Sequence, residues 1–352
     1  MRARTLMLLP LLALIGVASP APATPRERPP ANVQAWLPYW VFDEAVRDAN
    51  RNADLLDTVS PFWFNAAGCH RIDNKPTARN AGAVARLHGR GLLVTPSVTA
   101  GGLPPRTAVR CLGNSSSRTA HVRRLVRLAV SGDYDGLDID YENLALTTNV
   151  GQARRVRRAF AAFVEQLCPA LRRNGRTCSI TVMPRTGPGF TVWRGKLIPA
   201  VYDYKRIGRV ADEVRVMAYD QHAHQFGPGP IAGWPWVKQV VAFASSQMEA
   251  QRFRLGIPTY GRDFARGGSV SLTGTQARQR ARQHGAKIRW SREQREAWFT
   301  YRVGGVRHEV WFSSPRAVAV RARYADRLGL RGSALWAAGL GASGTWSALR
   351  RR

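Results

Sequence analysis

Apolar residues in this chain gather in short continuous runs, and these runs alternate with segments of helical periodicity. Continuous rather than alternating apolar runs are typical of parallel strands that are covered on both faces. Eight such strands are predicted, over residues 33–40, 56–65, 91–98, 136–142, 178–183, 214–220, 253–260 and 333–337.

Amphipathic helices are predicted between the strands. Apolar side chains repeat at i, i+3, i+4 and i+7 over residues 122–129, after a Ser-rich segment that can cap a helix. The same spacing recurs over 156–167, and 317–328 gives a third helix. This alternation predicts an α/β fold, a (β/α)8 TIM barrel over residues 31–352. The main alternative, an open doubly wound sheet, would carry a Gly-rich phosphate loop that the sequence lacks.

One stretch interrupts the alternation. Residues 264–312 contain Gly267-Gly268, a Gly304-Gly305 turn and strand-like pieces at 297–303 and 306–312. Glycine pairs of this kind mark turns between strands. We expect a small α+β insertion here, between the seventh strand and its helix.

The N-terminus has the pattern of a signal peptide. A basic start is followed by an apolar run over residues 6–18 and by Ala21-Pro22-Ala23, which fits the small-x-small cleavage rule. An uncleaved anchor is the alternative, but the run is short for a membrane span. We therefore expect a signal peptide over 1–23, a Pro-rich linker over 24–30, and a protein secreted to the cell wall.

Four cysteines occur in the chain, an even count that favours disulfides in an exported protein. Three pairings are possible, and we favour Cys168–Cys178, which closes a short loop, together with Cys69–Cys111. The sequence has no Cys-x-x-Cys motif, and His222-x-His224 offers too few ligands for a metal. We expect neither a metal site nor a cofactor.

The chain is strongly basic, with 53 Lys and Arg against 23 Asp and Glu and a formal net charge of +30. Such a charge attracts polyanions, and for an exported protein these would be the anionic polymers of a cell wall. A compositional bias toward arginine is the alternative explanation. Nucleic acid is not an expected partner, because no helix-turn-helix, zinc-finger or RNA-binding signature is present.

The most informative segment is Asp135-Gly136-Leu137-Asp138-Ile139-Asp140-Tyr141-Glu142. Strand side chains alternate, so Asp138, Asp140 and Glu142 share the face that points into the barrel. Three neighbouring acids in a core are costly unless they are hydrogen-bonded or share protons, so at least one should stay protonated near neutral pH. Glu142 comes last, closest to the catalytic rim, and is the candidate general acid.

Two other readings of these acids fit less well. A calcium loop needs a different spacing of its ligands. A solvated edge strand would lack the apolar residues Leu137, Ile139 and Tyr141. Asp135 begins the strand, and we assign it a structural role.

The octapeptide resembles the DGxDxDxE signature of family-18 glycoside hydrolases, the chitinase family. Met217-Ala218-Tyr219-Asp220 resembles that family's MxYD strand, 255–261 its seventh strand, and Trp336 the tryptophan that floors its sugar site. Residues 227–230, 258–261 and 310–312 resemble the branch that includes spore-germination peptidoglycan N-acetylglucosaminidases. The resemblance extends over residues 33–347.

The resemblance implies retaining hydrolysis by substrate assistance, an exception to the two-carboxylate scheme. Glu142 would protonate the glycosidic oxygen while the substrate's N-acetyl carbonyl attacks the anomeric carbon. Asp140 would hold the acetamido N–H, and Tyr219 the acetamido oxygen. Asp138 would share a proton with Asp140.

Other side chains near the predicted strand ends are expected to bind sugar. Aromatic rings offer platforms, and polar groups can bond hydroxyls. The candidates are Tyr39, Trp40, Ser97, Met217, Asp220 and Trp336. The pattern departs from the family at Asn143, where many chitinases have Tyr, and at 97–102, which lacks the usual SxGG.

We therefore expect a monomeric glycosidase that cleaves β-1,4 linkages of N-acetylglucosamine-containing polysaccharides, either peptidoglycan or chitin-like. A catalytically silent lectin of the same fold is the alternative, and a polyanion binder is a third reading that rests on charge alone. The sequence leaves the substrate, and exo or endo cleavage, open.

Overall fold

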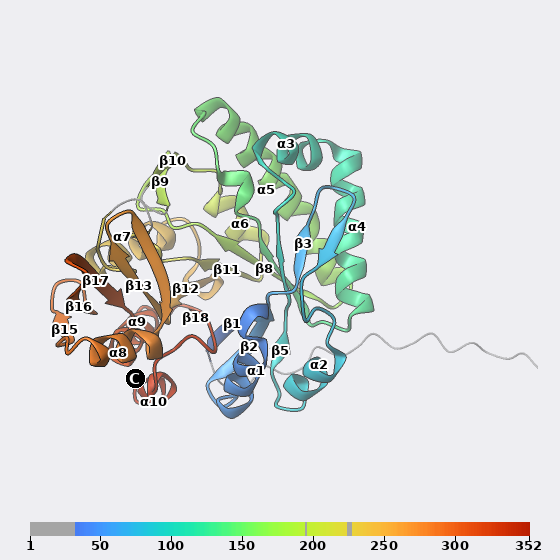
Figure 1. Ribbon diagram of the computed structural model, residues 1–352. Coiled ribbons are helices and arrows are strands. Elements are labelled where there is room, and N and C mark those ends of the chain that lie inside the picture. Colours follow the sequence, from blue (N-terminus) through green and yellow to red (C-terminus); the bar gives the residue numbers. More distant parts are fainter. Residues whose placement is uncertain (1–31, 194–195, 224–226) are drawn as a thin grey trace, which may run out of the picture.

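The computed structural model describes residues 32–193, 196–223 and 227–352 (Figure 1). The predicted signal peptide at 1–23, the linker at 24–30 and His224 lie outside the described residues. No helix in the described ranges is both long enough and apolar enough to cross a bilayer.

Eight parallel strand positions close into a ring. Each strand pairs with the next along the chain, and the last pairs with the first, Val33 lying opposite Ser333. The third position is split, because its first piece pairs with the second strand and its second piece with the fourth. The strands are β1 (Val33–Leu37), β2 (Leu56–Pro61), β5 (Leu93–Val94) with β6 (Ser97–Thr99), β7 (Gly136–Asp140), β8 (Thr177–Val182), β11 (Glu213–Val216), β12 (Phe253–Pro258) and β18 (Gly332–Trp336).

The predicted barrel is therefore confirmed, although several strands end earlier than expected. The fourth was predicted to reach residue 142 and ends at Asp140, and the sixth was predicted to reach 220 and ends at Val216. Residues 141–142 and 217–220, which follow the ends of these two strands, each include one tyrosine and one acid. There the backbone leaves the ladder, and side chains are directed into the barrel mouth.

Helices surround the ring, as the periodicity predicts. The predicted helices at 122–129 and 156–167 lie within α4 and α5, and the one at 317–328 corresponds to α9, which ends one residue earlier. Asn114 and Asn149 cap α4 and α5, because their side chains accept hydrogen bonds from the backbone N–H of Ser117 and Gln152. The helices are α1 (Phe42–Arg51), α2 (Ala81–His88), α3 (Pro105–Gly113), α4 (Ser115–Ser131), α5 (Val150–Arg173), α6 (Tyr204–Val210), α7 (Trp234–Ser245), α9 (Pro315–Arg327) and α10 (Thr345–Arg350), with short 3-10 turns η1 (Tyr39–Val41), η2 (Asn143–Ala145) and η3 (Ala250–Arg252).

The predicted insertion is an antiparallel sheet in the order β14-β13-β17-β16-β15, at the left of Figure 1. It begins at Tyr260 rather than at residue 264, because only Thr259 separates it from β12. Its elements are β13 (Tyr260–Ala265), β14 (Gly268–Thr273), α8 (Gly274–Gln283), β15 (Arg289–Ser291), β16 (Glu296–Val303) and β17 (Val306–Phe312). Two unpredicted hairpins complete the fold: β3 (Phe64–Ala66) with β4 (Ile72–Asn74), and β9 (Phe190–Trp193) with β10 (Lys196–Pro199).

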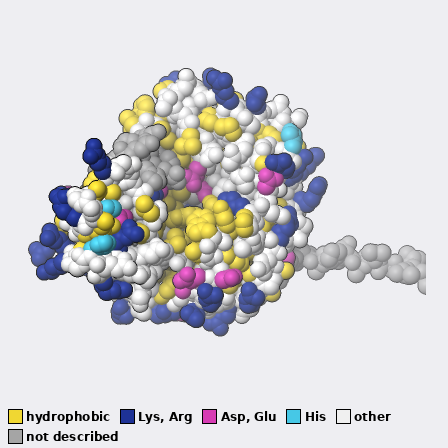
Figure 2. Space-filling view, in the orientation of Figure 1, with side chains coloured by type: hydrophobic (Ala, Val, Ile, Leu, Met, Phe, Trp, Pro, Cys, Tyr) yellow, Lys and Arg dark blue, Asp and Glu magenta, His cyan; other side chains and the backbone are white. Residues whose placement is uncertain are grey.

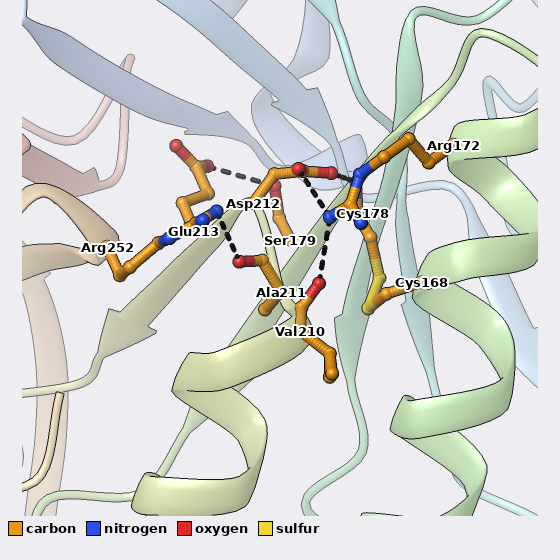
Figure 3. Close-up of a disulfide and its surroundings, with 9 residues drawn as sticks. All are labelled: Cys168, Arg172, Cys178, Ser179, Val210, Ala211, Asp212, Glu213 and Arg252. Carbon is orange, nitrogen blue, oxygen red and sulfur yellow. Dashed lines mark hydrogen bonds and ion pairs between the residues drawn. A yellow bond between two sulfur atoms is a disulfide. The ribbon is translucent and has the colours of Figure 1, made fainter. Parts of the chain in front are cut away.

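Both expected disulfides are present, Cys69–Cys111 and Cys168–Cys178. The second ties α5 to the amino end of β8, where the carboxylate of Asp212 accepts from the Cys178 N–H at 2.9 Å and from Arg172 at 2.9 Å (Figure 3). The first ties the loop between β3 and β4 to α3, and both of these follow the carboxyl ends of barrel strands. One bridge therefore braces each end of the barrel.

Candidate active site

The carboxyl ends of the strands surround a cavity of about 60 Å³. This is the end of a (β/α)8 barrel at which side chains from separate strands can converge. Figure 2 shows acidic side chains at the centre of this face, next to a broad hydrophobic area. The lining residues come from β1, β7, β8, β11 and β18 or just beyond them: Trp36, Asp140, Glu142, Thr181, Met217, Tyr219, Asp220 and Trp336.

Asp138 lies beneath this cavity and is completely buried. Its Oδ2 accepts from the Trp36 indole at 2.8 Å and the Ser97 hydroxyl at 2.6 Å, and its Oδ1 accepts from Thr181 at 2.7 Å. Arg215 approaches Oδ2 at 3.3 Å. Donors therefore surround both carboxylate oxygens, which anchors this side chain under its neighbour.

Asp140 is different, because its Oδ1 is buried yet finds no hydrogen-bond partner among the described residues. Burial raises the pKa of this carboxyl well above its usual range, and the nearby carboxylates of Glu142 and Asp138 raise it further. This shift in the pKa of Asp140 has the direction that the sequence analysis expects for one acid of the three. Its unpartnered oxygen is free to accept an N–H from a bound molecule.

Glu142 is the partly exposed member of the group and lines the cavity with Asp140. It lies just past the end of β7, where the backbone turns to a helical conformation before η2. Its neighbour Tyr141 faces outward and donates to or accepts from the ring of His121 at 2.7 Å. The alternation predicted from the sequence therefore holds through the strand end.

Tyr219 lines the same cavity. Burial raises the pKa of this phenol well above its usual value, so the hydroxyl keeps its proton and can donate a hydrogen bond. Gly256 makes room for it, since a Cβ there would lie 3.1 Å from the Tyr219 ring and 2.4 Å from the Val216 carbonyl oxygen. A glycine inside a predicted strand was the available signal for this close approach.

Asp220 has a left-handed backbone with φ of 57°, a conformation that Asp tolerates better than most residues. The insertion holds its carboxylate, which accepts from Arg262 Nη2 at 2.9 Å and from the Tyr260 hydroxyl. A second cavity, of about 400 Å³, shares Asp220 and Trp336 with the first and is lined by both barrel and insertion. The cleft therefore continues from the acids toward the insertion.

Aromatic rings form one wall of the site. Trp336 packs against Phe62 at 5.2 Å, Trp36 at 5.7 Å and Trp40 at 6.2 Å between ring centres. Trp40 is 52% exposed and meets Tyr39 edge-to-face at 5.0 Å. The structure thus brings three predicted aromatics together with Phe62 and Trp36, which the sequence analysis did not single out.

Ser97 is placed differently from the other predicted sugar ligands. Its side chain is fully buried, and its hydroxyl donates to Asp138 rather than lining either cavity. Its contact with sugar stays a prediction, and the structure shows a role in holding the acid beneath the cavity.

A buried charge network below the site was missed from the sequence. Arg215 pairs with Glu213 at 2.5 Å, and Glu213 pairs with Arg254 at 2.7 Å, which in turn pairs with Asp57 at 2.5 Å. Although burial pushes the pKa of Glu213 upward, Arg254 and Arg215 hold it below its usual value. The available signal was the alternation Glu213-Val214-Arg215-Val216 within a predicted strand.

Within the described ranges, no group of three or more His, Cys, Asp and Glu is arranged to hold a metal ion. The carboxylate of Asp138 instead accepts from Trp36, Ser97 and Thr181 and lies beside Arg215, as described above.

Known proteins resemble this chain in both sequence and structure. It is 28% identical over 309 residues to the sporulation-specific glycosylase YdhD of Bacillus subtilis, covering 84% of this chain and 69% of YdhD. It is 27% identical over 282 residues to the cortical fragment-lytic enzyme of Bacillus anthracis, covering 78% of this chain and 62% of that enzyme. A chitinase from Chromobacterium violaceum shares the fold, with a TM-score of 0.80 and 24% identity over 91% of this chain and 98% of the chitinase.

The sequence profile of one family spans most of the barrel. Residues 107–341 match the glycosyl hydrolases family 18, a range that begins before the acidic strand β7 and ends after Trp336. The match therefore includes the residues that line the small cavity, except Trp36. This chain is a glycosidase, and it belongs to the glycosyl hydrolases family 18.

Proposed function

We propose that this protein is a secreted, retaining hydrolase that cleaves β-1,4 linkages of N-acetylglucosamine-containing glycans by substrate assistance. The unpartnered Oδ1 of Asp140 carries the proposal, because it is a buried acceptor in a cavity shared with Glu142 and Tyr219. An acetamido group presents one N–H donor and one carbonyl acceptor. Asp140 and Tyr219 offer the complementary acceptor and donor.

In the first step, Glu142 transfers its proton to the glycosidic oxygen. The bond from that oxygen to the anomeric carbon breaks, and the acetamido oxygen forms a new bond to the anomeric carbon. Asp140 holds the acetamido N–H and balances the positive charge of the resulting oxazolinium ring. Tyr219 orients the acetamido group for attack, a positional effect that can supply several kcal/mol of the barrier.

In the second step, water attacks the anomeric carbon from the face that the leaving group vacated. Glu142 takes the water's proton as general base, and the acetamido oxygen leaves the anomeric carbon. Two displacements at the same carbon retain its configuration. Asp138 supports both steps from below, because its three donors and Arg215 hold it against Asp140.

The cleavage test uses purified peptidoglycan and a fluorogenic chitobiose substrate, with wild type beside Glu142→Gln. We expect wild type to release reducing ends and the variant, which keeps the shape but loses the proton, to lose at least 100-fold in kcat. Binding of glycan without turnover by both proteins would leave the lectin alternative standing and overturn the proposal. Retention of configuration at the anomeric carbon is tested by proton NMR, which identifies the anomer that forms first.

We also propose that the protein acts at a cell wall, where anionic polymers hold it. The names of the Bacillus relatives, which concern sporulation and cortical fragments, support this setting for the present chain. Its basic surface includes a pocket of about 350 Å³ between the insertion and the start of α9, lined by four arginines and a tryptophan. In the part of the chain that the structure describes, none of these four forms an ion pair with a carboxylate. They are Arg278, Arg282, Arg289 and Arg316.

A further inference from the structure

Lys75 lies on the aromatic wall of the cleft. Its ammonium is 3.8 Å from the centre of the Phe62 ring and 5.6 Å from that of Tyr39. Phe62 packs on Trp336 at 5.2 Å, and Trp336 lines the small cavity together with Glu142. The ammonium therefore lies beside the site, on the Phe62 ring that packs against Trp336.

This ammonium has no carboxylate within 4 Å among the residues that the structure describes, although it is only partly exposed. Burial lowers the pKa of Lys75 to about 8, while the carboxylates of Asp140 and Glu142 act in the opposite direction. At neutral pH the group still carries its charge. A partly buried cation that forms no direct ion pair is stabilised when a ligand places a carboxylate against it.

The backbone around Lys75 is well braced. Its N–H donates to the carbonyl of Trp63 at 2.7 Å, directly after the β3–β4 hairpin. The Cys69–Cys111 disulfide ties the loop of that hairpin to α3, and the carbonyl of Cys69 lies 3.1 Å from the ring of His121. The ammonium is therefore presented from a supported segment, as a preorganised binding group would be.

We propose that Lys75 binds a carboxylate carried by the sugar chain and so selects a carboxylate-bearing N-acetylglucosamine glycan over a neutral one. This inference rests on the proposed function and narrows its substrate class. In peptidoglycan, such a carboxylate is supplied by the lactyl ether of every second sugar or by the peptide attached to it. Chitin has no carboxylate, so the contact would discriminate between the two polymers.

The test compares matched glycan strands. Peptidoglycan strands freed of peptide by an amidase carry the lactyl carboxylate, and coupling that group to methylamine gives a neutral strand of nearly the same shape. Strands with intact peptides form a third arm, which separates lactyl from peptide carboxylates. The variants are Lys75→Gln, Lys75→Arg as the charge-preserving match, and Lys205→Gln as a control on the exposed surface of α6.

We expect wild type to prefer the free carboxylate, measured as the ratio of kcat/KM for charged and neutral strands. Lys75→Gln should lower that ratio about 10-fold, the usual worth of a hydrogen bond to a charged group. Lys75→Arg should restore most of it, and Lys205→Gln should leave it unchanged. In wild type the ratio should fall as the pH rises through 8, because the ammonium then loses its proton.

Two results would overturn the inference. An equal loss on charged and neutral strands would mean that Lys75 acts on the acids rather than on the substrate, and an unchanged ratio would mean that it has no such role. If wild type hydrolyses neither strand, the proposed function fails separately. Calorimetric affinities of the two strands for Glu142→Gln, with and without Lys75→Gln, then test the carboxylate contact without turnover.

Discussion

Three carboxyl groups of one strand end have three different environments. Asp138 is sealed among donors, Asp140 is buried with a free oxygen, and Glu142 is partly exposed. The raised pKa of Asp140 means that the folded protein carries an acid in a place where its charged form is disfavoured. The buried carboxyl of Asp140 therefore lowers the stability of the fold at the position where the proposed mechanism needs a hydrogen-bond acceptor.

Asp140→Asn is therefore expected to stabilise the fold at neutral pH while it abolishes efficient turnover. The pKa of Asp140 is higher in the folded than in the unfolded chain, so this group's contribution to the free energy of unfolding falls as the pH rises above about 4. Asn has no such charge. The melting temperature of the variant should exceed that of wild type at pH 7, and the difference should shrink as the pH falls to 4.

Asp138→Asn provides the contrast. Its carboxylate accepts from Trp36, Ser97 and Thr181 and lies beside Arg215. The NH2 group of an asparagine would face these hydrogen-bond donors, and Arg215 would lose one of its carboxylate partners. We expect this variant to melt below wild type at pH 7, at about 2–4 °C for each kcal/mol lost. Equal shifts of the melting temperature in calorimetric scans of the two variants would contradict the different environments of Asp138 and Asp140.

At the scale of elements, the two disulfides brace opposite ends of the barrel. Cys69–Cys111 spans 42 residues and holds the hairpin loop that precedes Lys75. Cys168–Cys178 spans 10 residues at the amino end of β8, away from the cavity. The bridges therefore provide matched tests of stability and of site geometry.

Removing either bridge by paired Cys→Ala changes should destabilise the protein, by about 4 kcal/mol for the longer loop and about 2.5 kcal/mol for the shorter, if loop entropy dominates. Only the Cys69/Cys111 pair is expected to lower kcat/KM, because only that pair holds a segment of the cleft wall. Denaturant titration and glycan hydrolysis measure the two effects. Equal losses of kcat/KM in the two variants would show that both act through general destabilisation of the fold and not through the cleft wall.

The insertion completes the site as well as extending the molecule. Arg262 and Tyr260 from its first strand hold Asp220, whose backbone adopts a left-handed conformation at the barrel mouth. The larger cavity runs between the two parts. The insertion therefore both orients an acid at the barrel mouth and forms a wall of the cleft.

At the scale of the whole molecule, positive charge is spread widely, but one pocket concentrates it. Arg278 and Arg282 lie four residues apart on α8, so they share one face, and Arg316 stacks on Trp290 at 4.3 Å. Arg280 of the same helix is by contrast paired with Asp263. The pocket is thus the place where a polyanion would find free guanidinium groups.

Replacing the four pocket arginines by Gln should weaken binding to a poly(glycerol phosphate) polymer and reduce the slope of log affinity against log salt by about 3. The matched control removes the same charge from four exposed α5 arginines that form no ion pair among the described residues: Arg154, Arg155, Arg158 and Arg173. Equal losses in the two variants, measured by calorimetry over a salt series, would point to the overall field instead of the pocket.

Much of the fold and part of the site followed from local pattern. Continuous apolar runs and helical spacing are set by neighbours within one segment, so they predicted the barrel, the insertion and α4, α5 and α9. The same alternation placed Asp138, Asp140 and Glu142 on one face. Loop length and even count led to the disulfide pairing.

Only the tertiary structure decided how these residues differ from one another. Whether an acid meets donors, a free space or solvent depends on segments far away in sequence: Trp36, Ser97 and Thr181 around Asp138, and Arg262 beside Asp220. The position of Lys75 over Phe62 likewise arises from the packing of a hairpin against the barrel mouth. Strand periodicity determines which way a side chain points, whereas ring closure and packing between distant segments determine what it meets.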